Sequence, residues 1–152
     1  MKHFPGANFS ERLTALPIDG VWRPVFIVEL AGCLPGEKVQ AFAEFEVTND
    51  TGRPVGVFAL MKLCADPSTY AGGFEMGEAN GRNVTPDMHH DTHTKAGSLT
   101  IPASLTGPVF LVVWARAVQT VTGLPPLTVE QDFGQVFVNV FKPDPYQPGE
   151  WL

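Results

Sequence analysis

Hydrophobic and polar residues alternate along several short stretches of this chain, with the period of a β-strand. In the clearest case, segment 39–48, the odd-numbered positions are apolar and the even-numbered ones are polar except for Phe42. Successive side chains of a strand point to opposite faces of a sheet, so this segment is predicted to be a half-buried strand. The 15 glycines and 14 prolines are spread along the chain. Because they would interrupt most helices, strands are expected throughout.

Further strands are predicted where apolar runs are bounded by Gly, Pro, Asn and Asp. They cover 25–31, 39–48, 55–65, 73–76, 89–95, 97–101, 109–119, 127–131 and 134–142. Segments 73–76 and 89–95 lie in a stretch that otherwise has loop composition, so about seven or eight strands are expected. Two hairpins are predicted, one around the polar turn 49–54 and one around residues 132–134. The fold class is therefore all-β, an antiparallel β-sandwich or jelly roll.

The two ends of the chain differ from its centre. Residues 1–20 are predicted to be an N-terminal arm, 21–142 the sandwich domain, and 143–152 a C-terminal arm rich in proline. Proline lacks a backbone donor, so the last segment cannot continue into the interior of a sheet. It ends in Trp151 and Leu152, which gain little from contact with water. The C-terminal arm is therefore expected to bind another surface.

Several predicted strands are apolar on both faces. Segment 109–119 carries Val, Leu and Ala on one face and mainly Phe110, Val112, Trp114 and Val118 on the other. A two-layer sandwich buries only one face of each sheet. Either loops or arms cover the outer faces, or another subunit does, since large exposed apolar patches usually mark interfaces. The predicted interface residues are Phe110, Trp114, Phe137, Phe141, Tyr146, Trp151 and Leu152. The expected partners include further copies of the chain in a closed homo-oligomer, a trimer being one form.

Composition and charge narrow the classes of partner. Only 17% of residues are charged, below the typical ~25% for soluble domains, and the net charge is −6. The ten Lys and Arg residues form no cluster, which argues against nucleic acid and anionic membranes as partners. No apolar run reaches the ~18–20 residues of a membrane span, and the start lacks a signal-peptide pattern. Synthesis in a cytoplasm is expected. Cys33 and Cys64 are predicted to be buried free thiols, with a disulfide as the alternative.

One segment carries side chains suited to chemistry. Three of the four histidines lie within residues 89–93. In an extended conformation, His89, Asp91 and His93 would share a face with Asp87 and could ligate a divalent metal. The facial triad of iron oxygenases needs a further histidine, and none follows His93. Solvated histidines, or a pH-sensitive contact on a threefold axis, are the alternatives. No catalytic residue and no cofactor are predicted.

The C-terminal half resembles a known class of proteins. Segment 94–103, strand 109–119, and segment 127–134 with its closing strand look like small accessory virion proteins of tailed bacteriophages, without a diagnostic motif. The resemblance implies a non-enzymatic β-sandwich in the virion, on the capsid or in the tail. Its partners would be the major capsid protein or other virion subunits. The leading hypothesis is a capsid decoration (cement) protein. One alternative is a carbohydrate-binding module of a tail or fibre, and another is a small metal-binding β-barrel enzyme using the histidine segment.

Deletion of residues 143–152 should leave the sandwich folded but weaken assembly, because the arm is expected to bind a neighbour and not its own domain. Circular dichroism would report the fold and sedimentation the assembly. A truncated chain that unfolds would show that the arm packs on its own domain.

Overall fold

The described part of the chain is built from strands. The structure is a computed structural model and describes residues 1–4, 12–86, 89–119 and 127–142. In these ranges it contains ten strands and no helix. They are β1 (Lys2–Phe4), β2 (Arg12–Leu16), β3 (Arg23–Glu29), β4 (Lys38–Thr48), β5 (Val55–Cys64), β6 (Phe74–Glu75), β7 (Asn80–Val84), β8 (Asp91–Thr100), β9 (Phe110–Val118) and β10 (Leu127–Phe141).

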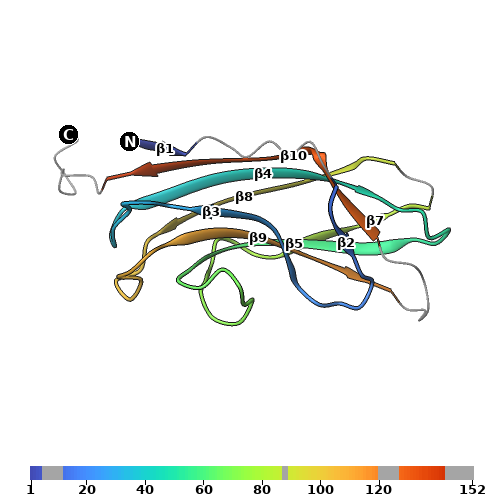
Figure 1. The fold of residues 1–152 in the computed structure, drawn as a ribbon, viewed down its shortest axis with the longest axis horizontal. Helices are drawn as coiled ribbons and strands as arrows, with labels where there is room; N and C mark the ends of the chain where they lie inside the picture. Colours follow the sequence, from blue (N-terminus) through green and yellow to red (C-terminus); the bar gives the residue numbers. More distant parts are fainter. Residues whose placement is uncertain (5–11, 87–88, 120–126, 143–152) are drawn as a thin grey trace, which may run out of the picture.

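The strands form two antiparallel sheets that stack on each other (Figure 1). The first sheet has the order β1-β10-β4-β8, and β2 also pairs with β10. The second sheet has the order β3-β9-β5-β6, and β7 also pairs with β5. The predicted antiparallel β-sandwich is confirmed, while the jelly roll stays a prediction.

The core lies between the two inward faces. In β4 the five odd-numbered residues from Val39 to Val47 are all buried, four of them at 0% exposure. This confirms the alternation seen in the sequence. The facing sheet contributes Leu111, Val113, Ala115 and Ala117 of β9 to the same apolar cluster. Burial of apolar surface, worth ~25 cal/mol per Å2, is the main force holding the sheets together.

The predicted hairpin between segments 39–48 and 55–65 is wrong. β4 pairs with β8 and β10, whereas β5 belongs to the second sheet and pairs with β6, β7 and β9. Residues 49–54 instead connect the two sheets. The Asn49 amide donates to the carbonyl oxygens of Arg53 at 2.8 Å and Val84 at 2.9 Å. Polar turn residues serve equally well in a hairpin and in a corner between sheets, so local composition could not distinguish the two.

The second predicted hairpin is also wrong, because β10 is one strand of 15 residues. Glu130 pairs with Glu46 and Gln135 with Glu44, so four residues of β10 lie opposite one residue of β4. The turn-like residues 132–134 therefore form an irregularity within a strand, as β-bulges do. Similarly, the predicted pieces 89–95 and 97–101 form a single strand, β8.

Strands also occur near the start of the chain, within the predicted N-terminal arm. β1 pairs with the last part of β10, and β2 pairs with its first part. Their place in the sheet comes from backbone pairing with β10, which the local apolar pattern does not reveal. The predicted C-terminal arm, 143–152, lies outside the described residues.

Both cysteines are in the state predicted from the sequence. Cys33 and Cys64 are free and buried, and burial raises the pKa of both thiols.

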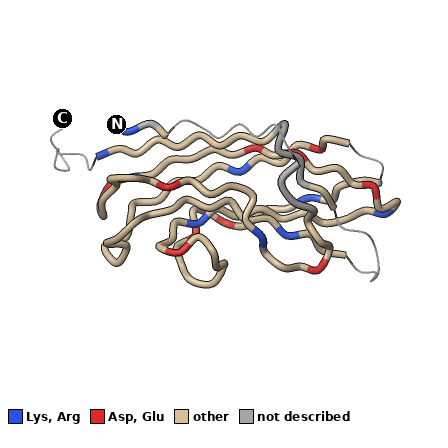
Figure 2. The backbone as a smooth tube through the Cα atoms, viewed as in Figure 1, with Lys and Arg blue, Asp and Glu red and all other residues tan. Residues whose placement is uncertain are grey.

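Lys and Arg of the described chain are distributed over both sheets and their loops (Figure 2). Within the described residues there is no helix long and apolar enough to cross a membrane.

Segment 76–78 closes the edge of the sandwich between β5 and β8. The Met76 amide donates to the Met61 carbonyl at 2.9 Å, and the Lys95 ammonium donates to the Glu78 carbonyl. Gly97 of β8 permits this approach, because an added Cβ would overlap the Met76 carbonyl oxygen.

Substituting Gly97→Ala should therefore destabilise the fold by roughly 1–3 kcal/mol, the usual cost of overpacking. Gly107→Ala is the matched control, since nothing lies within 4 Å of its added Cβ. Denaturant unfolding would measure both free energies. Equal stabilities of the two variants would contradict the close approach of Met76 to β8.

Candidate functional site

The first two inward positions of β8 are polar and buried. Asp91 pairs with Val47 and His93 with Phe45, and their exposed fractions are 7% and 5%. The His93 ring stacks on the Phe45 ring, with centroids 5.4 Å apart and planes inclined by 15°. The strand alternation therefore turns one carboxylate and one imidazole toward the interior.

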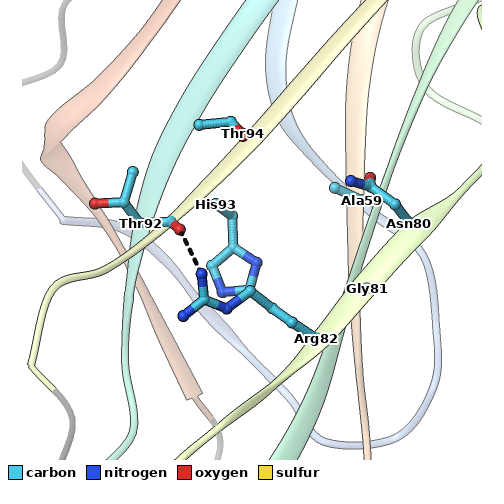
Figure 3. Close-up of a pocket in the computed structure, with 7 residues that line it drawn as sticks. All are labelled: Ala59, Asn80, Gly81, Arg82, Thr92, His93 and Thr94. Atoms are coloured by element: carbon cyan, nitrogen blue, oxygen red, sulfur yellow. Dashed lines mark hydrogen bonds between the residues drawn. The ribbon is translucent and has the colours of Figure 1, made fainter.

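Arg82 of β7 reaches these groups from the second sheet. Its Nη2 lies 2.6 Å from Oδ1 of Asp91, and its Nη1 donates to the Thr92 carbonyl at 3.4 Å (Figure 3). The ion pair thus joins the two sheets where β7 and β8 approach. Sequence reasoning missed Arg82 because its segment has loop composition and no apolar period. A single arginine in such a segment carries no signal of its partner.

The environment of His93 favours its neutral form. Burial lowers the pKa of His93 from 6.5 to about 4, because a charged imidazolium would lose its hydration there. The carboxylate of Asp91, whose Oδ2 lies 3.4 Å from Nε2 of His93, acts in the opposite direction. The guanidinium of Arg82 adds to the lowering. His93 is therefore uncharged at neutral pH.

A cavity of about 100 Å3 lies beside these residues. It is lined by Ala59 of β5, Asn80, Gly81 and Arg82 of β7, and Thr92, His93 and Thr94 of β8 (Figure 3). Pockets for drug-sized molecules usually occupy ~300–1,000 Å3, so this cavity is smaller than a typical site of that kind. The arrangement is suited to linking the sheets.

The predicted metal candidates are only partly brought together. His89 is exposed, and its Nε2 lies 3.9 Å from Asp50 rather than near Asp91 and His93. His90 has a φ of 58°, which breaks the strand alternation before β8 begins. Its Nδ1 lies 3.2 Å from the Glu46 carboxylate. Asp87 lies outside the described residues, among which no group of three or more His, Cys, Asp and Glu could hold a metal.

The centre of the outer face of the second sheet, at Trp114, is covered by the chain itself. Trp114 is only 2% exposed and packs with Cys64 and Val112. Tyr70, from the loop after β5, meets Trp114 edge-on at 5.5 Å, and Trp22 stacks on Tyr70 at 5.0 Å. Loop coverage, one of the two explanations for doubly apolar strands, therefore applies here. Trp114 has little area left for a partner.

A buried lysine holds this covering loop in place. The Lys62 ammonium donates to the carbonyl oxygens of Tyr70 at 2.8 Å and Gly72 at 3.2 Å. It also lies 3.7 Å from the centroid of the Tyr70 ring. In the sequence, Lys62 was only an interruption of an apolar strand.

The outer face of the first sheet keeps large apolar side chains exposed. Phe137 is 41% exposed and Phe42 is 39% exposed, and Phe141 is partly buried. Phe110 of the second sheet is also partly buried, against the Trp114 cluster. Tyr146, Trp151 and Leu152 lie outside the described residues. Phe42 was not among the predicted interface residues, although it was the apolar exception on the polar face of its strand.

Solved structures with a similar fold include chains of virus particles. The chain is similar to chains in the structure of infectious bursal disease virus Gx strain (TM-score 0.54, 12% identity) and in T=1 particles derived from that virus (TM-score 0.56, 12% identity). It is also similar to the VP2 subviral particle of infectious bursal disease virus (TM-score 0.51, 13% identity). These matches cover 95%, 93% and 95% of this chain but only 34%, 32% and 34% of the matched chains. The chain thus spans about a third of their length, and at this identity the likeness shows the fold alone.

Other comparisons give no relative. No protein-family model matches the chain, and no curated protein matches it. The bacteriophage resemblance stays a prediction, because the matched particles belong to infectious bursal disease virus.

The lowered pKa of His93 predicts a dependence of stability on pH. As the pH falls below 6.5 the unfolded chain protonates this histidine, while the folded chain does so only near pH 4. The stabilising effect is complete above pH 6.5 and is lost between 6.5 and 4. It amounts to on the order of 3 kcal/mol.

Denaturant unfolding of the parent chain and of His93→Gln from pH 7 to pH 4 would measure this loss. The variant should lose less stability over this range. His89→Gln, at an exposed position, should show the same change in the free energy of unfolding with pH as the parent chain. An equal change with pH for the parent and His93→Gln would contradict the buried neutral imidazole.

Proposed function

We propose that the chain is a non-enzymatic structural protein of a virus particle, most specifically a capsid decoration (cement) protein. The observation that carries the proposal is the similarity of nearly the whole chain to folds found in virus particles. Apolar side chains exposed on the outer face of one sheet support it independently. The proposed location is the virion, after synthesis in a host cytoplasm.

The proposed mechanism is stabilisation by buried area. Phe137 and Phe141 of β10, Phe110 of β9, and the arm residues Tyr146, Trp151 and Leu152 would pack against neighbouring subunits. Each Å2 of apolar surface removed from water contributes ~25 cal/mol before the cost of ordering the arms. The partners would be further copies of the chain, in a dimer, a trimer or another closed oligomer, together with the major capsid protein.

The structure gives the two alternatives less support. A carbohydrate-binding module that stacks sugars on Trp and Tyr rings needs those rings free, whereas Trp22, Tyr70 and Trp114 pack on one another. A metalloenzyme needs its ligands close together, and His89 lies apart from Asp91 and His93. Both arrangements favour an assembly role.

Quantitative mass spectrometry of purified particles of the virus that encodes the chain should detect it at a fixed ratio to the major capsid protein. The physical reason is that a subunit held by a repeated interface occupies a fixed number of sites. Particles lacking the chain should release their genome at lower temperature, because buried interface area is lost. Absence of the chain from washed particles would contradict the proposal.

A further inference from the structure

A row of apolar residues crosses the outer face of the first sheet. Phe42 of β4 pairs in register with Phe137 of β10 on one side and with Ala96 of β8 on the other. All three side chains are exposed, and cross-strand neighbours lie about 5 Å apart. We call Ala96, Phe42 and Phe137 the phenylalanine row.

The surface around this row is flat and uncharged along β8. The outward residues of β8 other than Ala96 are small, polar and exposed, namely Thr92, Thr94, Ser98 and Thr100. Gln40 and Asn139 form the adjacent register pair across β4 and β10. Interface centres are depleted of charge, because burying an unpaired charge is costly. The face meets that condition along β8 and at the Gln40–Asn139 pair, while on β4 the partly exposed Glu44 lies two residues from Phe42.

Opposite charges lie at equal distances on either side of the row. Lys38 precedes Phe42 by four residues and Glu46 follows it by four, all on β4. At ~3.3 Å per residue each charge lies about 13 Å from the row along the strand. Both lie on the outward side of β4, where Lys38 is exposed and the Glu46 side chain is 16% exposed, beside Thr92 and His90.

We propose that this face binds a second copy of the chain about a twofold axis running along the phenylalanine row. Such an axis places the two rows against each other and reverses the strand direction. Lys38 of each copy then lies opposite Glu46 of the other. The charge pattern is therefore self-complementary, which is what an isologous dimer requires. The proposal rests on the proposed function, in which copies of the chain assemble, and identifies the surface they use.

The face lies near the lower limit of size for a dimer interface. Strands β10, β4 and β8, ~4.8 Å apart over the nine residues from 38 to 46, together with the three residues of β1, cover about 480 Å2 in projection. Stable interfaces bury ~600 Å2 or more on each partner. On the outer face of the second sheet the exposed large apolar residues, Ile27, Phe74 and Val118, lie on three different strands around a centre that the loop carrying Tyr70 covers.

Sedimentation of the full chain should show a dimer at micromolar concentration. Lys38→Glu alone, or Glu46→Lys alone, creates two like-charge pairs per dimer. Each should raise the dissociation constant by about tenfold or more. Phe42→Ser should have a similar effect through lost apolar contact. Circular dichroism would confirm that each variant is folded.

The decisive measurement is an equimolar mixture of the Lys38→Glu and Glu46→Lys variants. In a mixed dimer both pairs are again of opposite charge, so the mixture should dimerise as tightly as the parent chain. The double variant K38E/E46K should recover in the same way. Glu46 also contacts His90 in its own chain, so its substitution alone could weaken dimerisation indirectly. Restored dimerisation of the mixture is therefore a more specific test of the pairing than weakened dimerisation of one variant.

Glu75→Lys is the control, since it reverses an exposed charge on β6 of the second sheet and should leave dimerisation unchanged. A parent chain that stays monomeric at ~100 μM would overturn the proposal. So would a mixture that fails to recover, or a dimer that appears only after deletion of residues 143–152. A monomer that still incorporates into particles would refute the dimer and leave the proposed function intact. A dimer in solution together with absence of the chain from particles would refute the proposed function and leave the dimer intact.

Discussion

Each sheet of a two-layer sandwich has one face in the core, and any apolar residues on its other face need a second cover. This constraint governs most of the molecule beyond its core. On the second sheet the chain itself provides this cover, because the loop after β5 places Tyr70 over Trp114. On the first sheet Phe42 and Phe137 remain exposed. The same constraint therefore produces a covered centre on the outer face of one sheet and exposed phenylalanine side chains on the outer face of the other.

Three buried charged side chains, Lys62, Lys95 and Asp91, fix how the layers and loops are held. Lys62 ties the covering loop to β5, Lys95 ties segment 76–78 to β8, and Asp91 joins the two sheets through the exposed Arg82. Removing such groups from water costs free energy, and their hydrogen bonds to carbonyl and carboxylate oxygens offset much of it. Apolar contacts are non-directional, whereas these bonds have defined geometry. They hold the covering loop, segment 76–78 and strand β7 in fixed positions.

The strands of the centre were predictable because each carries its own signal. Alternation in β4 and the apolar runs of β5 and β9 indicated strands whichever neighbours they had. The pairing of β4 with β8 and β10 was not predictable, because residues 49–54 have the composition of a hairpin turn and act as a corner between sheets. In the candidate site, Asp91 and His93 share a face as expected, but Arg82 comes from a segment without periodicity. The positive φ of His90 ended the alternation that would have included His89.

The sequence by itself determined the class of fold, the inward face of the central strands and the excess of apolar strand faces. These properties depend on the order of residues within ten or so positions, where the period of a strand is decisive. Only the tertiary structure decided which outer face has a covered centre. That choice depends on where the loop after β5, held by the nearby Lys62, meets Trp114 of β9, which is distant in the chain. Pairing register across three strands likewise placed Ala96, Phe42 and Phe137 in one row. In the sequence, Ala96 lies 54 positions after Phe42 and 41 positions before Phe137.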